Sequence, residues 1–257
     1  MLKRILIAAG VLLGALVLVV AVLAYATFAG RKPIADGLDI RGIHIVQDGI
    51  TSLAIVPVGA GRVALVDAGN DPAGEAVLAE LRRQALGPEA VTAVLLTHGH
   101  ADHLGAIARF PGAEVLALAS EVDVVEGRVG THGPLTRLFP VTPTGVVVSR
   151  PLQDGEIVSL GDVDARVYAV PGHTPGSAAY LINGVLFVGD SADVDSRDQV
   201  IGAPWPFSDS QVQNRASLVQ LGERLRSAGL AVEAIVPAHS GALRVGLEPL
   251  LAFAREP

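Results

Sequence analysis

The chain has 257 residues, which is enough for one large domain or two small ones with a proper buried core. Its formal net charge of −7 does not favour a nucleic-acid partner, because such a partner requires a basic surface. The sequence contains no cysteine, so disulfides are excluded and any bound metal must be held by histidine and carboxylate side chains.

The first 30 residues have the composition of a membrane segment. Lys3 and Arg4 precede the run 5–29, which carries no charge. A helix needs roughly 20 apolar residues to cross a bilayer. We therefore expect residues 1–30 to form a single-pass anchor, with the rest of the chain outside the cytoplasm. The alternative is a signal segment with a cleavage site at 24–26, which would give a secreted or periplasmic protein. Residues 31–37 are expected to form a linker.

Short β-branched runs dominate the next part of the chain. We expect strands, separated by the glycine-rich turns of hairpins, at 42–46, 51–58 and 62–66. Asp71 and Pro72 are expected to start a helix, as its N-cap and first residue, that ends before Gly87. The apolar run 91–96 then predicts a buried strand.

The second half of the chain predicts more strands and one long helix. We expect short helices at 104–109 and 120–126, and strands at 114–118, 157–160, 165–170, 178–182, 185–188 and 234–236. The longest amphipathic helix is expected at 211–228, with a short helical tail at the C-terminus. The segments 130–145 and 191–209 are expected to be long loops. Two batches of strands, each followed by helices, predict an α/β fold of two packed sheets with helices outside.

The stretch 97–103 reads Thr-His-Gly-His-Ala-Asp-His and directly follows the predicted strand 91–96. Imidazole nitrogen and carboxylate oxygen are ligands that Zn²⁺ accepts. Residues two apart in an extended segment point the same way, so His98 and His100 can bind one ion. Asp102 and His103 lie further round the turn and would face a second ion. This stretch therefore predicts a metal site.

Three later strand ends carry further ligand-type side chains. They are His173 in the Pro-Gly-His-Thr-Pro-Gly turn, Asp190 after Val-Gly, and His239 after Val-Pro-Ala. Five of the seven histidines therefore lie at predicted strand ends, which a domain without a metal site does not require. The other two are His44, interpreted as an ordinary strand residue, and His132, interpreted as a solvated loop residue.

The motifs HGHADH, PGHTPG, VGD and PAH, in this order, resemble those of the metallo-β-lactamase-fold hydrolase superfamily. The resemblance covers the chain from about residue 38 and implies a four-layer αββα sandwich over 38–257, with a dinuclear metal site at one edge. The implied ligands are His98, His100 and His173 for the first metal, Asp102, His103 and His239 for the second, and Asp190 as the bridge. It also implies that Asp67, at the end of a strand, contacts the ligand residues rather than the metal and holds them in place.

The ligand set also indicates branches of the superfamily. Antibiotic-hydrolysing members usually have cysteine or serine at the bridging position, so Asp190 together with His103 is more similar to the glyoxalase II, lactonase and tRNA-processing branches. The acidic net charge does not favour the tRNA-processing branch. Glyoxalase II enzymes carry an additional C-terminal domain that helps to bind glutathione, whereas only residues 240–257 follow His239 here. The resemblance therefore does not favour glutathione thioesters.

We accordingly expect a zinc-dependent hydrolase with two Zn²⁺ per chain; iron or manganese is compatible with the same ligands. A metal-bridging hydroxide would attack a small ester, lactone or thioester, and the catalytic residue Asp102 would orient it and pass a proton to the leaving group. Alternatives are a mononuclear iron sulfur dioxygenase of the same fold, a phosphodiesterase or β-lactamase activity, and a catalytically silent binding protein. The expected partners are a small-molecule substrate and, through residues 5–29, a membrane. The loops 130–145 and 191–209 are candidates for the pocket wall.

Overall fold

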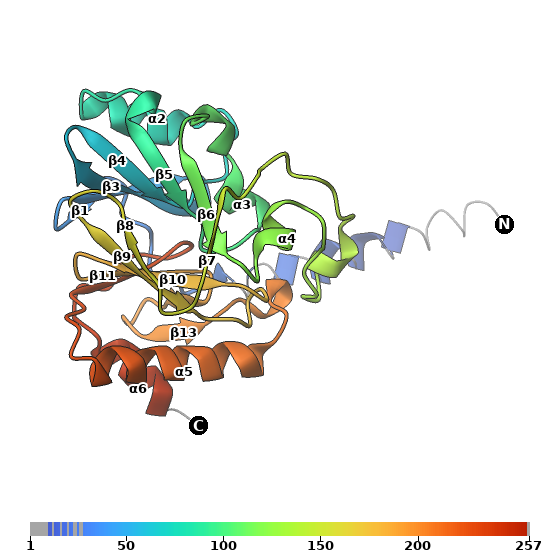
Figure 1. Cartoon of the computed structure of the whole chain (residues 1–257). Coiled ribbons are helices and arrows are strands. Elements are labelled where there is room, and N and C mark those ends of the chain that lie inside the picture. Colours follow the sequence, from blue (N-terminus) through green and yellow to red (C-terminus); the bar gives the residue numbers. More distant parts are fainter. Residues whose placement is uncertain are drawn as a thin grey trace.

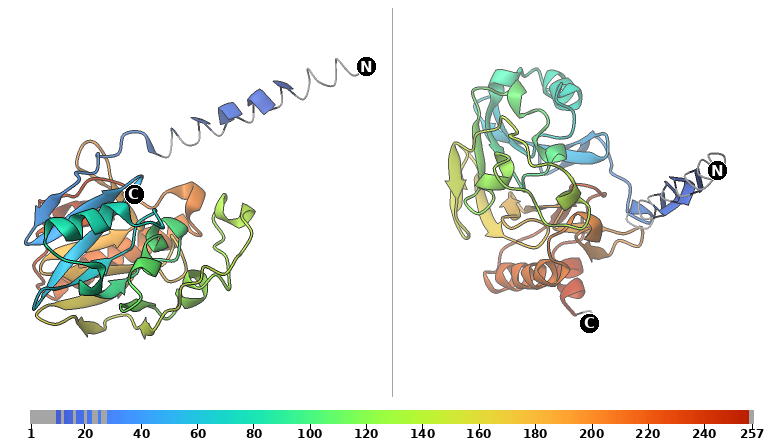
Figure 2. Two further views of the ribbon diagram at one scale, coloured as in Figure 1. Left: turned by 90° about the horizontal axis from the view of Figure 1, so that it is seen from above. Right: turned by 90° about the vertical axis from the view of Figure 1, so that its right-hand side faces the viewer.

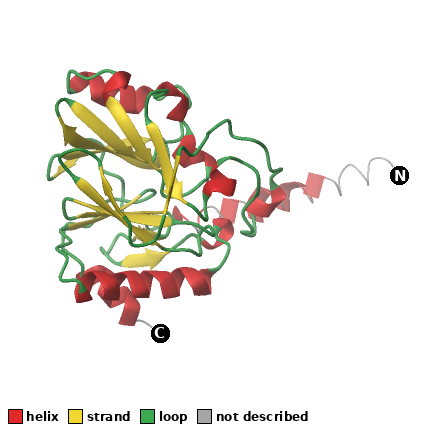
Figure 3. Cartoon of the chain, in the orientation of Figure 1, coloured by secondary structure: helices red, strands yellow, loops and turns green. Residues whose placement is uncertain are grey.

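The structure is a computed structural model, and it describes residues 10, 11, 13–15, 17–19, 21, 22, 25 and 28–255. Two β-sheets lie face to face, and helices cover both outer faces (Figure 1). Figure 3 shows the strands in the middle and the helices outside them. The predicted αββα sandwich is therefore confirmed.

The first sheet has seven strands in the order of the sequence. They are β1 Leu38–Ile40, β2 Ile43–Asp48, β3 Thr51–Gly59, β4 Arg62–Val66, β5 Val91–Leu95, β6 Glu114–Leu118 and β7 Arg150–Leu152. The strands β1 to β4 pair antiparallel through short turns, whereas β4 to β7 are parallel and need longer crossovers. The crossovers contain α2 Glu75–Arg83, α3 Ala101–Leu104, α4 Val122–Val125 and the short 3₁₀ helices Pro88–Ala90, Ile107–Arg109 and Thr136–Leu138.

The second sheet has five strands. In spatial order they are β14 Ala234–Pro237, β11 Val185–Gly189, β10 Ala178–Ile182, β9 Asp164–Ala169 and β8 Ile157–Ser159. Its outer face is covered by α5 Gln211–Ser227 and α6 Glu248–Arg255, on the opposite side of the molecule from α2 (Figure 2). A separate two-stranded ribbon, β12 Ala192–Val194 and β13 Val200–Gly202, lies beside α6 and precedes the 3₁₀ helix Trp205–Phe207.

The main core lies between the two sheets, and β4 shows how the sequence builds it. Ala64 and Val66 face the second sheet, whereas Val63 and Leu65 face the helices on the outer side. Successive residues of a strand point to opposite faces, so an uninterrupted apolar strand serves both layers. On the far side, Leu218 of α5 packs in the corresponding outer cluster.

Three local predictions need correction. The helix α2 begins at Glu75, because Asp71 accepts hydrogen bonds from the backbone N–H groups of Ala73 and Glu75 in a turn before it. The predicted helix 104–109 is two shorter ones, α3 and a 3₁₀ turn. The segment 191–209 is not one long loop, because it contains β12, β13 and a 3₁₀ helix.

The predicted membrane anchor over 5–29 is wrong by the structure, and the extracytoplasmic location that was derived from the anchor loses its support. A span requires a continuous apolar helix of roughly 20 residues. Within the part of the chain that the structure describes, no helix has that length and apolarity. Part of the run, including residues 5–9, lies outside the described residues.

Candidate metal centre

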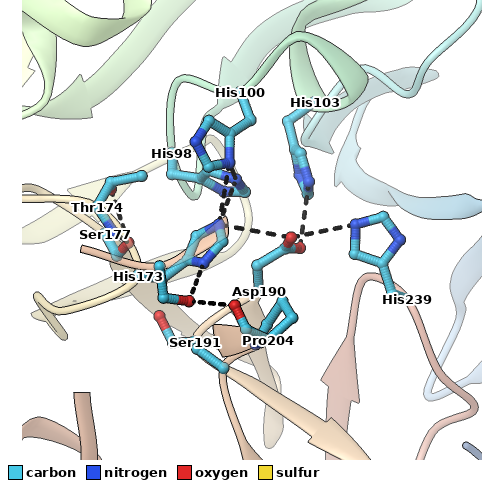
Figure 4. Close-up of polar contacts among 12 residues, drawn as sticks. His98, His100, His103, His173, Thr174, Ser177, Asp190, Ser191, Pro204 and His239 are labelled. Carbon is cyan, nitrogen blue, oxygen red and sulfur yellow. Dashed lines mark hydrogen bonds and ion pairs between the residues drawn. The ribbon is translucent and has the colours of Figure 1, made fainter. Parts of the chain in front are cut away.

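The seven predicted ligands converge at one edge of the sandwich. Figure 4 labels all of them except Asp102. Strand β5 of the first sheet and the parallel strands β11 and β14 of the second sheet end at this edge, and each is followed there by ligand residues. His173 comes from the turn between β9 and β10. Because the ends of neighbouring strands meet at a sheet edge, residues more than a hundred positions apart become neighbours.

The first cluster consists of His98, His100, His173 and Asp190, whose ligand-type atoms all lie within 4.8 Å of one another. The Nε2 atom of His173 lies 3.2 Å from Nε2 of His98 and 3.0 Å from Nδ1 of His100. Nε2 of His98 and Nδ1 of His100 are 3.1 Å apart. Three ring nitrogens therefore point at one another across a space where a single cation would contact all three.

Hydroxyl groups behind two of these rings determine which ring nitrogen carries the proton. Thr97 donates its hydroxyl to Asp67 at 2.8 Å, so its oxygen accepts from Nδ1–H of His98 at 3.1 Å. Ser208 donates its hydroxyl to the Pro204 carbonyl at 2.7 Å and accepts from Nδ1–H of His173 at 3.0 Å. Each imidazole then presents the lone pair of Nε2 to the cluster, as metal binding requires.

The second cluster consists of Asp102, His103 and His239. Nε2 of His239 lies 3.2 Å from Oδ2 of Asp102 and 3.1 Å from Oδ2 of Asp190. The other carboxylate oxygen of Asp190, Oδ1, lies 3.2 Å from Nε2 of His103. Asp190 therefore stands between the two clusters, as Figure 4 shows.

Acceptors behind the second cluster orient its imidazoles in the same way. Nδ1–H of His239 donates to the Ile50 carbonyl at 2.8 Å, and Nδ1–H of His103 donates to Asp67 at 2.9 Å. Asp67, which follows β4 with a φ of 60°, also accepts from the backbone N–H of Thr97 at 2.7 Å. One buried carboxylate thus orients His103 of the second cluster directly and His98 of the first cluster through Thr97, which agrees with the supporting role expected of Asp67.

The histidines of the first cluster have lowered pKa values, whereas the pKa of His239 in the second cluster is raised. Burial lowers the pKa of His98, His100 and His173, in the last case to about 3. Burial also opposes a charge on His239, but the attraction of Asp190 and Asp102 is stronger and raises its pKa to about 10. The pKa of Asp190 is held well below its usual range by His239 and His103, in spite of burial.

The donor set fits a divalent cation. Nε2 of His103 and Oδ1 of Asp190 lie 3.2 Å apart, but both are buried and neither makes a hydrogen bond. A buried polar atom without a partner is costly, and a bound ion would remove that cost. The groups are nitrogen and oxygen donors without sulfur, which suits zinc, iron or manganese.

Glu121 is a functional residue that the sequence did not reveal, because it lies in the short segment interpreted as a helix at 120–126. Its buried carboxylate accepts the backbone N–H of Gly99 at 2.9 Å and that of Gly176 at 2.7 Å. Gly99 separates His98 from His100, and Gly176 ends the His173 turn. Burial raises the pKa of Glu121 to about 7. One side chain therefore joins the two loops that carry the first cluster.

A cavity of about 350 Å³ opens onto both clusters, with Asp102 and Asp190 among its lining residues. The segments 130–145 and 191–209 each contribute to it, through Thr136 and Phe207. Phe139 lines a neighbouring hollow beside His100, whereas Trp205 is exposed. His44 and His132 lie outside the two clusters, as expected.

The sequence profile of the metallo-beta-lactamase superfamily matches residues 47–239. A hydroxyacylglutathione hydrolase of Xanthomonas euvesicatoria is 34% identical over 135 residues, covering 51% of this chain and 42% of that protein. Human metallo-beta-lactamase domain-containing protein 1 is 36% identical over 109 residues, covering 42% of this chain and 34% of that protein. The chain thus spans less than half the length of these relatives.

Solved structures with the same fold include two bacterial proteins. A subclass B3 metallo-beta-lactamase of Bradyrhizobium japonicum has a TM-score of 0.64 and 18% identity, covering 88% of this chain and 92% of that one. The metallo-beta-lactamase MIM-1 of Novosphingobium pentaromativorans has a TM-score of 0.60 and 25% identity, covering 85% and 90%. With the matched profile spanning well over half of the sequence, the chain belongs to the metallo-beta-lactamase superfamily.

Proposed function

We propose that this chain is a metal-dependent hydrolase that holds two zinc ions and cleaves a small ester, lactone or thioester. The observation that carries the proposal is the convergence of seven nitrogen and oxygen donors into two adjacent clusters that share Asp190. The first ion would be held by His98, His100 and His173, and the second by Asp102, His103 and His239. The relatives named hydroxyacylglutathione hydrolases support hydrolysis of an acyl compound over the oxidation of a persulfide.

When bound, zinc would supply Lewis acidity toward the substrate carbonyl and lower the pKa of a bound water toward 7. The chain itself fixes the tautomers and the orientation of the ligand histidines. The tautomers of His98 and His173 are held by Thr97 and Ser208, and the ring of His103 is held by Asp67. These contacts keep the ligands in one orientation without a conformational change.

Asp102 is the carboxylate that we assign to proton transfer. Its side chain is 24% exposed and lines the cavity, whereas that of Asp190 is only 6% exposed. Burial favours its neutral form, but His103 and His239 outweigh this effect and lower its pKa. Asp102 is therefore ionised at neutral pH and able to accept a proton from the attacking water before passing it to the leaving group.

Metal analysis of the purified full chain, followed by a substrate panel, tests the proposal. We expect close to two zinc ions per chain, and hydrolysis of a lactone or thioester that is lost on chelation and restored by zinc. His98→Ala and Asp190→Ala should each reduce the metal content and abolish activity, whereas His132→Ala, on an exposed loop, should change neither. Protein that takes up no zinc, or full activity in the His98→Ala and Asp190→Ala double variant, would refute the proposal. One iron per chain with oxygen consumption would instead identify the dioxygenase.

A further inference from the structure

The cavity beside the metal clusters has a polar floor and apolar walls. The floor is formed by His100, Asp102, Asp190 and His239, and the walls by Phe28, Ile50, Pro204 and Phe207. No lysine or arginine is among the described residues that line it. A substrate group that carries carboxylates, as glutathione does, would find no lysine or arginine to pair with along these walls. An uncharged apolar group would instead bury its surface against the two aromatic rings.

One of these rings comes from the segment that precedes the two sheets. Phe28 precedes β1 in the chain, and its ring centroid lies 6.3 Å from that of Phe207, with the planes tilted by 45°. The guanidinium of Arg31 lies over the same ring, 4.6 Å from its centroid. Phe28 is therefore held from two sides while it lines the cavity.

Backbone hydrogen bonds attach the segment that carries Phe28 to the site. The N–H of Lys32 donates to the Val194 carbonyl at 2.8 Å, and the N–H of Gly241 donates to the Lys32 carbonyl at 2.9 Å. Ser196 donates its N–H to the Gly30 carbonyl at 2.7 Å. The segment 30–32 is thereby fixed between the β12–β13 ribbon and the loop that follows His239.

A buried ion pair strengthens this attachment. Arg31 lies 2.8 Å from Asp193, and their side chains are 7% and 1% exposed. The other oxygen of Asp193 accepts the hydroxyl of Ser240 at 2.8 Å, and Ser240 adjoins the ligand His239. The position of Phe28 is thus coupled through three side chains to the second cluster.

We propose that Phe28 is a specificity-determining residue that, with Phe207, receives an uncharged apolar group of the substrate. The substrate class is accordingly an ester or lactone with an alkyl or aryl substituent, rather than an anionic thioester. This inference rests on the proposed hydrolase function, and it assigns part of the binding site to the segment that precedes the two sheets.

The test compares lactones that share one ring and one scissile bond. The wild-type chain should hydrolyse γ-decalactone with a kcat/KM well above that for γ-butyrolactone, because each buried methylene contributes about a fourfold gain. Phe28→Ala should reduce this preference by about 10-fold or more, mainly through KM, since it removes a full aromatic wall. Phe28→Leu should retain most of the preference. Tyr25→Ala, an exposed position on the same segment, should leave both rates unchanged.

Binding of an alcohol without a scissile bond separates this inference from the proposed function. Saturation-transfer NMR should show contact between 1-octanol and the wild-type chain that is lost in Phe28→Ala and kept in Tyr25→Ala. Octanol binding through Phe28 without hydrolysis of any lactone, ester or thioester would support the apolar site and contradict the hydrolase. Lactone hydrolysis whose chain-length preference survives Phe28→Ala would overturn the inference alone, as would a preference for S-lactoylglutathione over decalactone.

Discussion

Glu121→Gln is the substitution that tests most directly how the metal loops are held together. Glu121 is fully buried and accepts two backbone N–H groups, but it has no described cationic partner. An ionised carboxylate in such a place costs stability, which is why its pKa is raised from 4.5 to about 7. Glutamine keeps the shape and removes the charge, although its amide nitrogen must then face one of the two N–H groups.

The magnitude follows from the pKa shift. The folded chain holds a proton on Glu121 up to about pH 7, whereas the unfolded chain releases it near 4.5. Between these values the folded state binds more protons, so the free energy of unfolding falls as the pH rises. At 1.36 kcal/mol per pKa unit, the loss across the window is about 3 kcal/mol. The Glu121→Gln variant has no titrating group at this position and lacks this loss.

Urea denaturation from about pH 5 to about pH 9, in the presence of a chelator, measures the effect. The difference in unfolding free energy between wild type and Glu121→Gln should change by about 3 kcal/mol across this range, in favour of the variant at high pH. Glu223→Gln, on the exposed face of α5, is the matched control and should show no such change. A difference that stays constant with pH would refute the reasoning that Glu121 is a buried titrating group.

Three further substitutions test the supports of the site. Asp67→Ala leaves the rear N–H of His103 without an acceptor, so metal affinity should fall by about 10- to 100-fold in competition with a chelating dye; unchanged affinity would argue against the positioning role. Tyr180→Phe removes the donor to a buried carbonyl and should cost about 1–3 kcal/mol in urea denaturation, and a loss near zero would count against that hydrogen bond. Gly99→Ala would place Cβ 2.7 Å from a backbone nitrogen of α4 and should reduce bound zinc, whereas Gly112→Ala, with open space around it, should not; equal zinc contents would contradict the close approach.

Local sequence predicted most of the strands and the residues that the structure brings into the two clusters, whereas their assignment as metal ligands came from the family resemblance. The run 91–96 is apolar except for Thr92 and is followed at once by Thr97 and His98, so both the buried strand β5 and the loop after it followed from the order of residue types. Asn183 and Gly184 likewise predicted the hairpin between β10 and β11, with Asn183 at a positive φ of 48°. These features depend on neighbours in the chain, and short-range sterics and burial decide them.

Other features required the tertiary structure, because they depend on residues far apart in the chain. The carboxyl group of Glu121 accepts the N–H of Gly176, which is 55 positions away in the sequence. No local pattern identifies Glu121 as the residue that joins the two loops. Phe28 belongs to a run predicted as a membrane anchor, yet its ring lines the cavity beside Phe207. Hydropathy reports only that such a side chain prefers an apolar environment. Whether that environment is a bilayer, a core or a substrate pocket is decided by the surface that the rest of the fold brings against it.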